Sequence, residues 1–356
     1  MKSIIPNKEN VKLIGRTYPL DEALWCAFSG TGIEFDFKGS RLSLTLLADK
    51  ACEEQEAGNH ARYAVYLNGE RIITGILRTR RTTLGIIDSE KPVEARVQVI
   101  KLSECAMSTM GIAALETDEA AVVSPTKQRE RRIEFIGDSI TCGYGVDDEN
   151  ELHPFKTSTE DCTGAYAYKT AQLLDADYSL VSISGYGIIS GYTATAEEKI
   201  ADQTIPQYYK KLGFSYKSFA DKLAPQDIEW DFKQYIPQAV VINLGTNDDS
   251  YCLDHKDRQR DYTDNYKLFL REVRAKNPDA FIFCAVGIMG TRIYTALETA
   301  VNEYKSETGD DRIKSYCFTE QDHEHDGYAA DYHPTRKTHD KAAAAFAPVI
   351  KETMGW

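Results

Sequence analysis

The sequence has 356 residues, 42% of them hydrophobic, and a formal net charge of −13 at pH 7. A chain of this length usually exceeds one core, so we expect two domains. The negative charge disfavours nucleic acid and anionic lipid as partners, and no run of about 18 apolar residues predicts a membrane-spanning helix.

The start of the chain and the cysteines bear on the compartment. Residues 1–10 contain a lysine but no apolar segment of the roughly 7–15 residues found in a secretory signal peptide, which favours a cytoplasmic protein. None of the eight cysteines forms a Cys-x-x-Cys pair. Cys284 and Cys317 lie in apolar, strand-like runs, so reduced thiols are favoured over disulfides. The sequence leaves open whether the chain forms a homo-oligomer.

Up to residue 125 the chain predicts short strands separated by turns. A first run with period two, 33–37, is expected to stop at Lys38-Gly39, and a second covers 42–46. The run 63–67 leads into Asn68-Gly69, a strong hairpin signal. Residues 95–100 predict a further strand. Residues 1–125 are therefore predicted to form a β-sandwich of the jelly-roll type.

After a polar segment at 125–132 the pattern changes to strands alternating with helices. This alternation predicts an α/β domain over residues 130–356, with a parallel sheet covered by helices on both faces. Thr163 is expected to cap the first helix and Pro334 to start the last. The long polar loop 141–163 is expected to wall a site. The predicted strands are 133–136, 179–183, 239–242, 281–286 and 313–318, and the predicted helices are 165–174, 261–275, 296–308 and 335–354.

Polar motifs follow four of these strands. Ser139 comes directly after the first strand, on a tight turn that presents its hydroxyl at the carboxyl edge of the sheet. A serine hydroxyl needs an adjacent base to act as a nucleophile, and His333, after the last strand, is the best candidate. The oxyanion formed in acyl transfer needs donors. The Ser139 N–H, a glycine N–H at Gly185 or Gly187, and the Asn247 amide can supply them.

Each motif alone has a simpler interpretation, since serine after Gly-Asp or asparagine after Gly-Thr is usually a turn residue. It is the joint occurrence at successive strand ends that indicates an acyl-transfer site. The segment His323-Glu324-His325 could indicate a metal, but on a polar loop it is more often solvated. No phosphate-binding glycine motif is present. We therefore expect neither a metal nor a cofactor.

The motif set resembles the conserved blocks of the SGNH (GDSL) hydrolase superfamily, which implies a flavodoxin-like catalytic domain. The N-terminal module resembles carbohydrate esterase family 2, in which a jelly-roll domain precedes an SGNH domain. The resemblance implies Ser139 as nucleophile, His333 as base, and Ser139, Gly185 and Asn247 as the oxyanion hole. The segments that carry it are 137–141, 184–185, 245–248 and 331–334 for the superfamily, and 13–16, Trp25 and 32–35 for the family.

One spacing departs from the superfamily pattern. Asp331 lies two residues before His333, where the common block has three, and position 330 is Ala. Asp331 could still turn inward as the third catalytic residue, a backbone carbonyl could orient the imidazole, or Glu324 or Asp326 could do so. Members of the family are known that work with a Ser-His dyad.

The resemblance implies a serine esterase that removes O-acetyl groups from carbohydrates through an acetyl-enzyme. In the cytoplasm its substrates would be imported, acetylated xylo-oligosaccharides. Among the tyrosines beside the motifs, Tyr186 and Tyr332 are our candidates for contact with the sugar. Two alternatives stay open: another SGNH esterase, such as a thioesterase or lysophospholipase, and a glycan-binding protein with a relict site.

Overall fold

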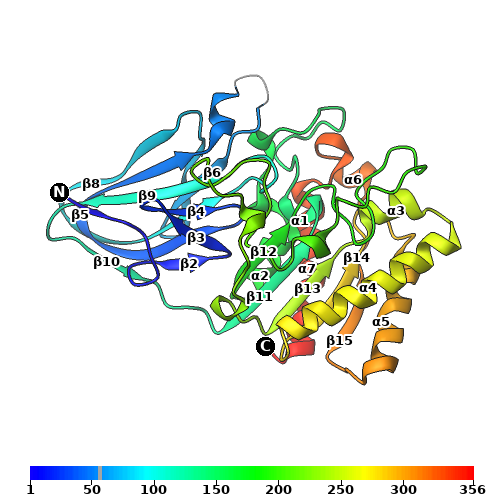
Figure 1. Cartoon of the computed structure of the whole chain (residues 1–356). Helices are drawn as coiled ribbons and strands as arrows, with labels where there is room; N and C mark the ends of the chain where they lie inside the picture. Colours follow the sequence, from blue (N-terminus) through cyan, green and yellow to red (C-terminus); the bar gives the residue numbers. More distant parts are fainter. Residues whose placement is uncertain (55–57) are drawn as a thin grey trace. The chain divides into compact units, whose positions relative to one another are not determined.

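The computed structural model of the chain describes residues 1–54 and 58–356, which form two compact units (Figure 1). The sequence placed a single division between residues 125 and 130. The structure differs in that two later segments pack with the first unit. The first unit comprises residues 1–128, 156–162 and 211–230, and the second comprises 129–155, 163–210 and 231–356.

The first unit is built on an antiparallel sheet, of which the described residues form ten strands. Seven of them follow one another in the order β3-β4-β9-β5-β8-β6-β7, while β1 pairs with β9 and both β2 and β10 pair with β5. The strands are β1 (Lys2–Ile4), β2 (Lys12–Ile14), β3 (Thr17–Leu20), β4 (Ala23–Cys26), β5 (Gly32–Ala48), β6 (Arg62–Leu67), β7 (Glu70–Ile76), β8 (Arg81–Lys101), β9 (Met110–Thr117) and β10 (Val122–Pro125).

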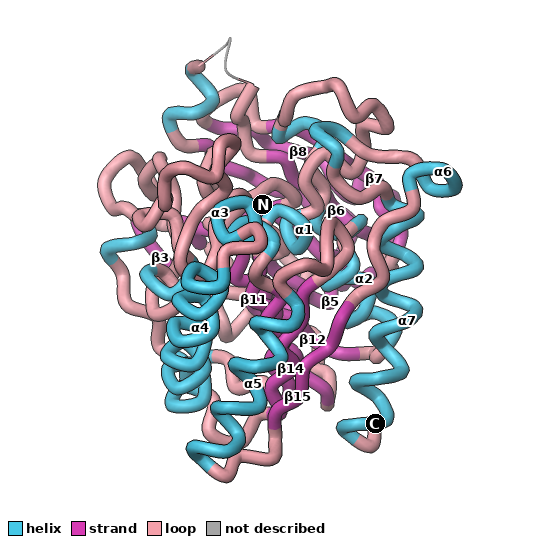
Figure 2. The backbone as a smooth tube through the Cα atoms, turned by 90° about the vertical axis from the view of Figure 1, so that its right-hand side faces the viewer, coloured by secondary structure: helices cyan, strands magenta, loops and turns pink. Residues whose placement is uncertain are grey.

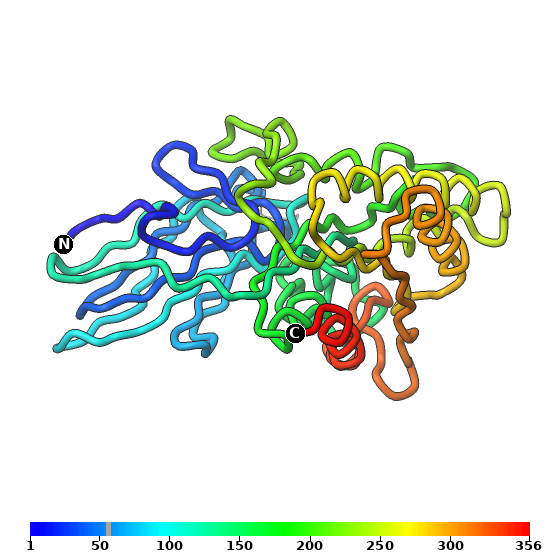
Figure 3. Tube along the Cα trace, turned by 90° about the horizontal axis from the view of Figure 1, so that it is seen from below, coloured from blue at the N-terminus to red at the C-terminus, as the bar shows by residue number. Residues whose placement is uncertain are grey.

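The long strands β5 and β8 run antiparallel along the unit (Figure 3). The N-terminal half of β5 pairs with β2 and β10 and its C-terminal half with β9, so the sheet curls into two layers around one core. Alternate residues of β5, including Phe35, Phe37 and Leu44, point into that core. The predicted fold class of this unit is confirmed.

Two local predictions for the first unit had different outcomes. Lys38-Gly39 does not end a strand, because β5 continues to Ala48. The pairing of β5 with β8 accommodates this segment by a register shift between Gly39 and Arg41. The hairpin at Asn68-Gly69 is confirmed. Both residues have positive φ, +53° and +86°, as a tight two-residue hairpin turn requires.

The second unit contains a five-stranded parallel sheet in the order β12-β11-β13-β14-β15. All five predicted strands are present, with ends shifted by up to three residues. Their buried residues are nearly continuous, as expected for strands covered on both faces. The strands are β11 (Arg131–Gly137), β12 (Ala176–Ser182), β13 (Ala239–Asn243), β14 (Phe281–Val286) and β15 (Ile313–Cys317).

Helices cover this sheet on both faces: α4 and α5 lie on one side, and α2 and α7 on the other (Figure 2). The order of strands, with the second outside the first, is the flavodoxin-like arrangement. The longer helices are α2 (Tyr166–Leu173), α4 (Lys256–Lys276), α5 (Tyr294–Thr308) and α7 (Arg336–Met354), and the short ones are α1 (Ser139–Cys142), α3 (Thr246–Cys252) and α6 (His323–Asp326).

Two predictions at helix ends and one of a loop were wrong. The residue that precedes α2 is Ala165, with no side-chain cap, so Thr163 does not cap it. Helix α7 begins at Arg336, and the Thr335 hydroxyl accepts the capping hydrogen bond, so Pro334 lies just before the helix. The segment His323-Glu324-His325 belongs to the one-turn helix α6, capped by Asp322, and is not a loop.

Candidate active site

Ser139 lies where β11 gives way to α1. The strand ends at Gly137, and Asp138 caps the helix by accepting a hydrogen bond from the Ile140 N–H at 3.0 Å. A Cβ atom at Gly137 would lie 2.0 Å from the Thr141 hydroxyl oxygen, so only glycine allows this turn to close. As the first residue of the helix, Ser139 has a backbone N–H with no partner inside the helix.

The Ser139 hydroxyl is hydrogen-bonded to His333, although 194 residues separate them. The distance from Ser139 Oγ to His333 Nε2 is 2.9 Å. On the other side of the ring, Nδ1 lies 3.0 Å from the backbone carbonyl oxygen of Asp331. A carbonyl only accepts, so Nδ1 carries the proton and Nε2 presents its lone pair to the serine.

The carboxylate of Asp331 does not contact the imidazole; it accepts a hydrogen bond from the Tyr144 hydroxyl at 3.2 Å. The residue has left-handed backbone angles, φ 54° and ψ 40°, which direct its carbonyl to the ring. Of the arrangements that the sequence left open, the structure therefore contains the one with a backbone carbonyl.

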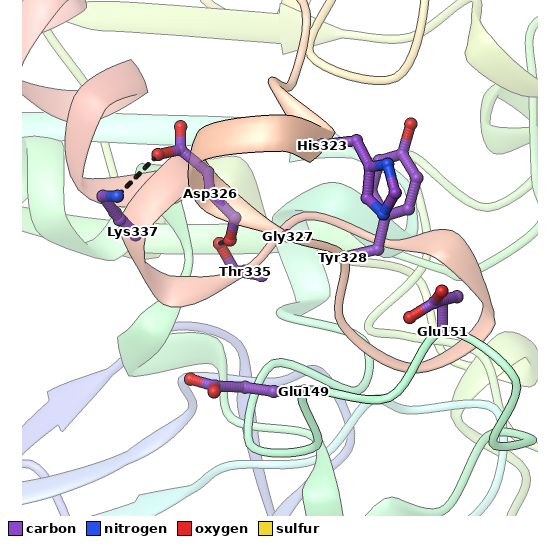
Figure 4. Close-up of a pocket in the computed structure, with 8 residues that line it drawn as sticks. All are labelled: Glu149, Glu151, His323, Asp326, Gly327, Tyr328, Thr335 and Lys337. Atoms are coloured by element: carbon purple, nitrogen blue, oxygen red, sulfur yellow. Dashed lines mark hydrogen bonds and ion pairs between the residues drawn. The ribbon is translucent and has the colours of Figure 1, made fainter.

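The two other acidic candidates lie away from His333. Glu324 is exposed on α6, and Asp326 is ion-paired with Lys337 at 3.0 Å and with Lys341 at 2.6 Å. Asp326 and Lys337 line a pocket of about 320 Å³ beside the start of α7 (Figure 4). His323 lines the same pocket with its ring stacked on Tyr328, centroids 4.5 Å apart. Among the described residues, no group of three or more His, Cys, Asp or Glu could hold a metal ion.

One face of the His333 imidazole is covered by the ring of Tyr144. Its ring stacks on Tyr144 with centroids 3.9 Å apart, and Tyr144 stacks in turn on Phe155 at 4.4 Å. Loss of hydration on burial lowers the pKa of His333 from 6.5 to about 4, more than the hydrogen bond to Asp331 raises it. The imidazole is therefore neutral, and able to accept a proton, at neutral pH.

The register of the sheet brings the oxyanion candidates to the same edge. Gly137 pairs with Ser182 of β12 and with Asn243 of β13, so the loops that carry Ser139, Gly185 and Asn247 leave the sheet at one level. The Asn247 Nδ2 group donates hydrogen bonds to the Tyr186 carbonyl at 2.9 Å and to Asp138 Oδ2 at 3.3 Å. Asn247 is thus in contact with both other loops.

The structure distinguishes the two candidate glycines. The Gly187 N–H donates to the Gln203 carbonyl at 3.2 Å. The Gly185 N–H has no acceptor in the part of the chain that the structure describes, and the residue has a φ of +81° that favours glycine. Gly185 is therefore the glycine with a donor available at the edge of the sheet.

Asp248 is a residue whose role the sequence reasoning missed. Its buried carboxylate accepts hydrogen bonds from three consecutive backbone N–H groups, those of residues 188, 189 and 190, at 2.6–3.2 Å. Burial outweighs these bonds and raises the pKa of Asp248 to about 6. Burial also raises the pKa of Asp138 to about 7, with Asp248 adding to it. Its position in the sequence, directly after Asn247, is the signal that could have identified it as part of the site.

The two tyrosines proposed to contact sugar have different surroundings. Tyr186 is only 4% exposed and packs edge-on against Tyr208, which leaves little of its ring for a ligand. Tyr332 is 51% exposed, has a left-handed φ of +60°, and contacts the ring of Tyr328 edge-on. Of the two, only Tyr332 offers an open surface.

All eight cysteines are free, and all but Cys317 are buried. In the described ranges, the helices are all too short or too polar to cross a membrane.

A serine hydrogen-bonded to a neutral histidine, with unpaired N–H groups near it at the edge of a parallel sheet, can carry out acyl transfer. The chain's similarities agree. Residues 135–341, more than half of the chain, match the GDSL-like lipase/acylhydrolase family, and residues 13–126 match the N-terminal domain of carbohydrate esterase 2. The chain belongs to the GDSL-like lipase/acylhydrolase family, with the two-domain arrangement of family 2 carbohydrate esterases, and is an esterase.

Three similar proteins extend across both units. The cellulase/esterase CelE of Acetivibrio thermocellus is 29% identical over 93% of this chain, which spans only 38% of that protein. An acetylxylan esterase/glucomannan deacetylase of Cellvibrio japonicus is 25% identical, covering 99% of this chain and 92% of its own. A family two carbohydrate esterase from Clostridium thermocellum, solved with cellohexaose, is 28% identical with a TM-score of 0.82, covering 97% of this chain and 99% of its own.

Proposed function

We propose that this chain hydrolyses O-acetyl esters on carbohydrates, chiefly acetylated xylo-oligosaccharides, with Ser139 and His333 as a catalytic dyad. The observation that carries the proposal is the 2.9 Å hydrogen bond between Ser139 Oγ and His333 Nε2. Nε2 holds a free lone pair because Nδ1 donates to the Asp331 carbonyl. The base is thus in the protonation state and orientation that the first step needs.

In the first half-reaction Ser139 Oγ attacks the acetyl carbonyl carbon while its proton moves to His333 Nε2. The carbonyl electrons pass to oxygen, which the N–H groups of Ser139 and Gly185 and the Asn247 amide stabilise. Of the two hydrogen bonds that Asn247 Nδ2 donates, the longer one, to Asp138 Oδ2 at 3.3 Å, is the one that we propose is exchanged for this oxyanion. Collapse breaks the bond to the sugar oxygen, which takes the proton from His333, and leaves an acetyl-enzyme.

In the second half-reaction a water molecule replaces the sugar. His333 takes a proton from the water, the oxygen attacks the acetyl carbonyl carbon, and the same three donors hold the oxyanion. Collapse releases acetate and returns the proton to Ser139 Oγ. No step requires a metal or a cofactor.

The preference for acetylated xylo-oligosaccharides is supported by the similar proteins. One is named an acetylxylan esterase/glucomannan deacetylase, and another was solved in complex with cellohexaose. Tyr332 offers an exposed ring next to His333 on which a sugar ring can stack. We further propose a cytoplasmic location, which the free thiols support because disulfides are rare there, and which limits the substrate to imported oligosaccharides.

The decisive experiment measures acetate release from acetylated xylo-, manno- and gluco-oligosaccharides in parallel. We expect release from all three to require Ser139, with the highest kcat/KM for the xylo-oligosaccharide. Acetate release that persists in Ser139→Ala and disappears with a chelator would contradict the mechanism. A higher kcat/KM for the manno- or gluco-substrate would correct the substrate alone.

A second experiment separates this proposal from a thioesterase or lysophospholipase. We expect kcat/KM for 4-nitrophenyl esters to fall from acetyl to butyryl, with the octanoyl ester nearly inert. Rates that rise with acyl chain length would assign the chain to the lipase-like alternative. Binding of oligosaccharide without any Ser139-dependent turnover would instead support a glycan-binding protein.

A further inference from the structure

Tyr144 is in contact with the imidazole of His333. It lies just after α1, between two glycines with left-handed backbones, Gly143 (φ +76°) and Gly145 (φ +59°). Its ring is 3.9 Å from the His333 ring and 4.4 Å from that of Phe155, with interplanar angles of 22° and 28°. Two nearly parallel rings this close cannot share one face, so Tyr144 lies between them.

The hydroxyl of the same tyrosine reaches the residue that orients His333. It donates to Asp331 Oδ2 at 3.2 Å, while the Asp331 carbonyl accepts the hydrogen bond from His333 Nδ1 at 3.0 Å. Tyr144 therefore contacts both the imidazole and the side chain of the residue whose carbonyl orients it.

We infer that Tyr144 is a positioning residue, which together with the Asp331 carbonyl supports His333 in the way a carboxylate does in a Ser-His-Asp triad. The ring fixes the plane of the imidazole, and the hydroxyl holds the Asp331 carboxylate away from Nδ1 so that the carbonyl takes its place. This inference rests on the proposed function, because it presumes that His333 acts as the base.

The role of the Tyr144 ring follows from the positive charge that develops on His333 during catalysis. When the serine proton moves to Nε2, His333 becomes an imidazolium whose face lies against an electron-rich aromatic ring, and this attraction offsets part of the hydration that the cation loses on burial. In the resting state the same ring keeps water from the imidazole, in agreement with its low pKa. A triad carboxylate would favour the cation in both states.

The role of the Tyr144 hydroxyl follows from the backbone that it supports. Residues 331 and 332 are both left-handed, with φ of +54° and +60°. Two successive non-glycine residues in this region are costly and need support from their surroundings. The Asp331 N–H donates to the His153 carbonyl at 3.1 Å, and the Ala330 N–H donates to the Asp148 carbonyl at 2.8 Å. The bond from Tyr144 adds the side-chain anchor to these two backbone anchors.

The test compares Tyr144→Phe, which removes the hydroxyl, with Tyr144→Leu, which removes the aromatic ring as well. Tyr168→Leu is the matched control, because Tyr168 is also half-buried in the second unit and packs edge-on against Tyr178. With 4-nitrophenyl acetate we expect kcat to fall about threefold in Tyr144→Phe and about 50-fold in Tyr144→Leu, with KM within about twofold of wild type.

A second measurement records the His333 ring pKa by NMR, with the signal assigned from its absence in His333→Asn. Tyr144→Leu should raise this pKa towards 6.5 because the imidazole becomes hydrated, whereas Tyr168→Leu should leave it unchanged. A purely structural role for Tyr144 would not move this value.

The outcomes separate the inference from the function on which it rests. Full activity in Ser139→Ala would defeat the proposed function. Loss of activity in Ser139→Ala, with Tyr144→Leu no slower than Tyr168→Leu, would overturn the role of Tyr144 alone. If Tyr144→Leu does not fold, the pair Tyr144→Phe and Asp331→Ala decides: a combined loss no larger than the larger single loss supports the inference, and additive losses overturn it.

Discussion

Ser139 and His333 lie 2.9 Å apart, yet the segments that carry them are held differently. The loops around Ser139 are buried and tied together by carboxylates: Asp138 caps α1, and Asp248 binds three backbone N–H groups. The segment of His333 is exposed at Asp331 and Tyr332, and it is held by backbone hydrogen bonds, by ring stacking and by the bond from the Tyr144 hydroxyl to Asp331. Substitutions on the serine side should therefore affect folding and activity together, and those on the histidine side should affect mainly activity.

The largest expected effect comes from the two reacting groups. Ser139→Ala and His333→Ala should each lower kcat for acetyl esters by about 10³-fold or more, because the two act as a unit. The exposed Ser306→Ala and His255→Ala serve as matched controls and should keep wild-type rates. Rates near wild type in either active-site variant, measured by acetate release, would remove that residue from the mechanism.

The substitution Asp248→Asn tests how the loops around Ser139 are held. The three backbone N–H groups converge on Oδ1, and that of Ile188 also reaches Oδ2. Asparagine replaces the charged acceptor by a neutral oxygen and an NH2 group that repels the Ile188 N–H, and bonds to a charged group are worth about 1.5–3 kcal/mol each. We expect the free energy of unfolding to fall by about 2–4 kcal/mol and kcat by about tenfold or more, because the loop of Gly185 loses its anchor. Asp249→Asn, which loses only a contact with Arg292, is the control in thermal unfolding and kinetics. Equal losses of stability and kcat in Asp248→Asn and Asp249→Asn would show that the loops around Ser139 do not depend on the Asp248 carboxylate.

The pKa of His333 tests whether the imidazole is shielded from water. Its ring should titrate near pH 4 by NMR, against 6.5 for an ordinary histidine. Since the folded pKa is lowered, the unfolded state binds the proton more tightly. The contribution of His333 to stability is thus present above pH 6.5 and is lost as the pH falls towards 4. Titration near 6.5 would show that the ring is hydrated and that the stacked tyrosine does not shield it.

The smallest effect is expected at Asp331, whose carboxylate does not contact the imidazole. Asp331→Asn should change kcat by less than about threefold, because asparagine tolerates the left-handed backbone. Asp331→Ala should cost about tenfold at most, at least tenfold less than His333→Ala. Losses as large as in His333→Ala, with unchanged circular dichroism, would identify Asp331 as a full triad member.

The sequence predicted most of the architecture because buried parallel strands are short apolar runs, and such runs are visible without a structure. It also predicted that Ser139, Gly185 and Asn247 would reach one edge, which follows from the rule that parallel strands end together. The resemblance to flavodoxin-like domains implied the order that places β11 between β12 and β13. The alternation of strands and helices alone did not give this order, because it depends on packing between distant segments.

The support of His333 could not be predicted for a similar reason. Spacing alone showed that Asp331 was one residue too near, but the left-handed backbone that presents its carbonyl depends on bonds to residues 148 and 153, far away in the sequence. Tyr144 was visible only as one of several tyrosines near the motifs. The glycines on either side of it were the local signal of a turn that carries the ring to His333.

The interleaving of the two units limits how the protein can be divided. The side chain of Asp161, from a segment that interrupts the hydrolase unit, is fully buried and pairs with Arg71 of the sandwich at 2.6 Å. Cutting the gene near codon 128 would leave Arg71 without this partner and remove residues 211–230 from the same unit. Neither product would be a complete folding module. Moving the hydrolase unit into another protein by engineering therefore requires both units together.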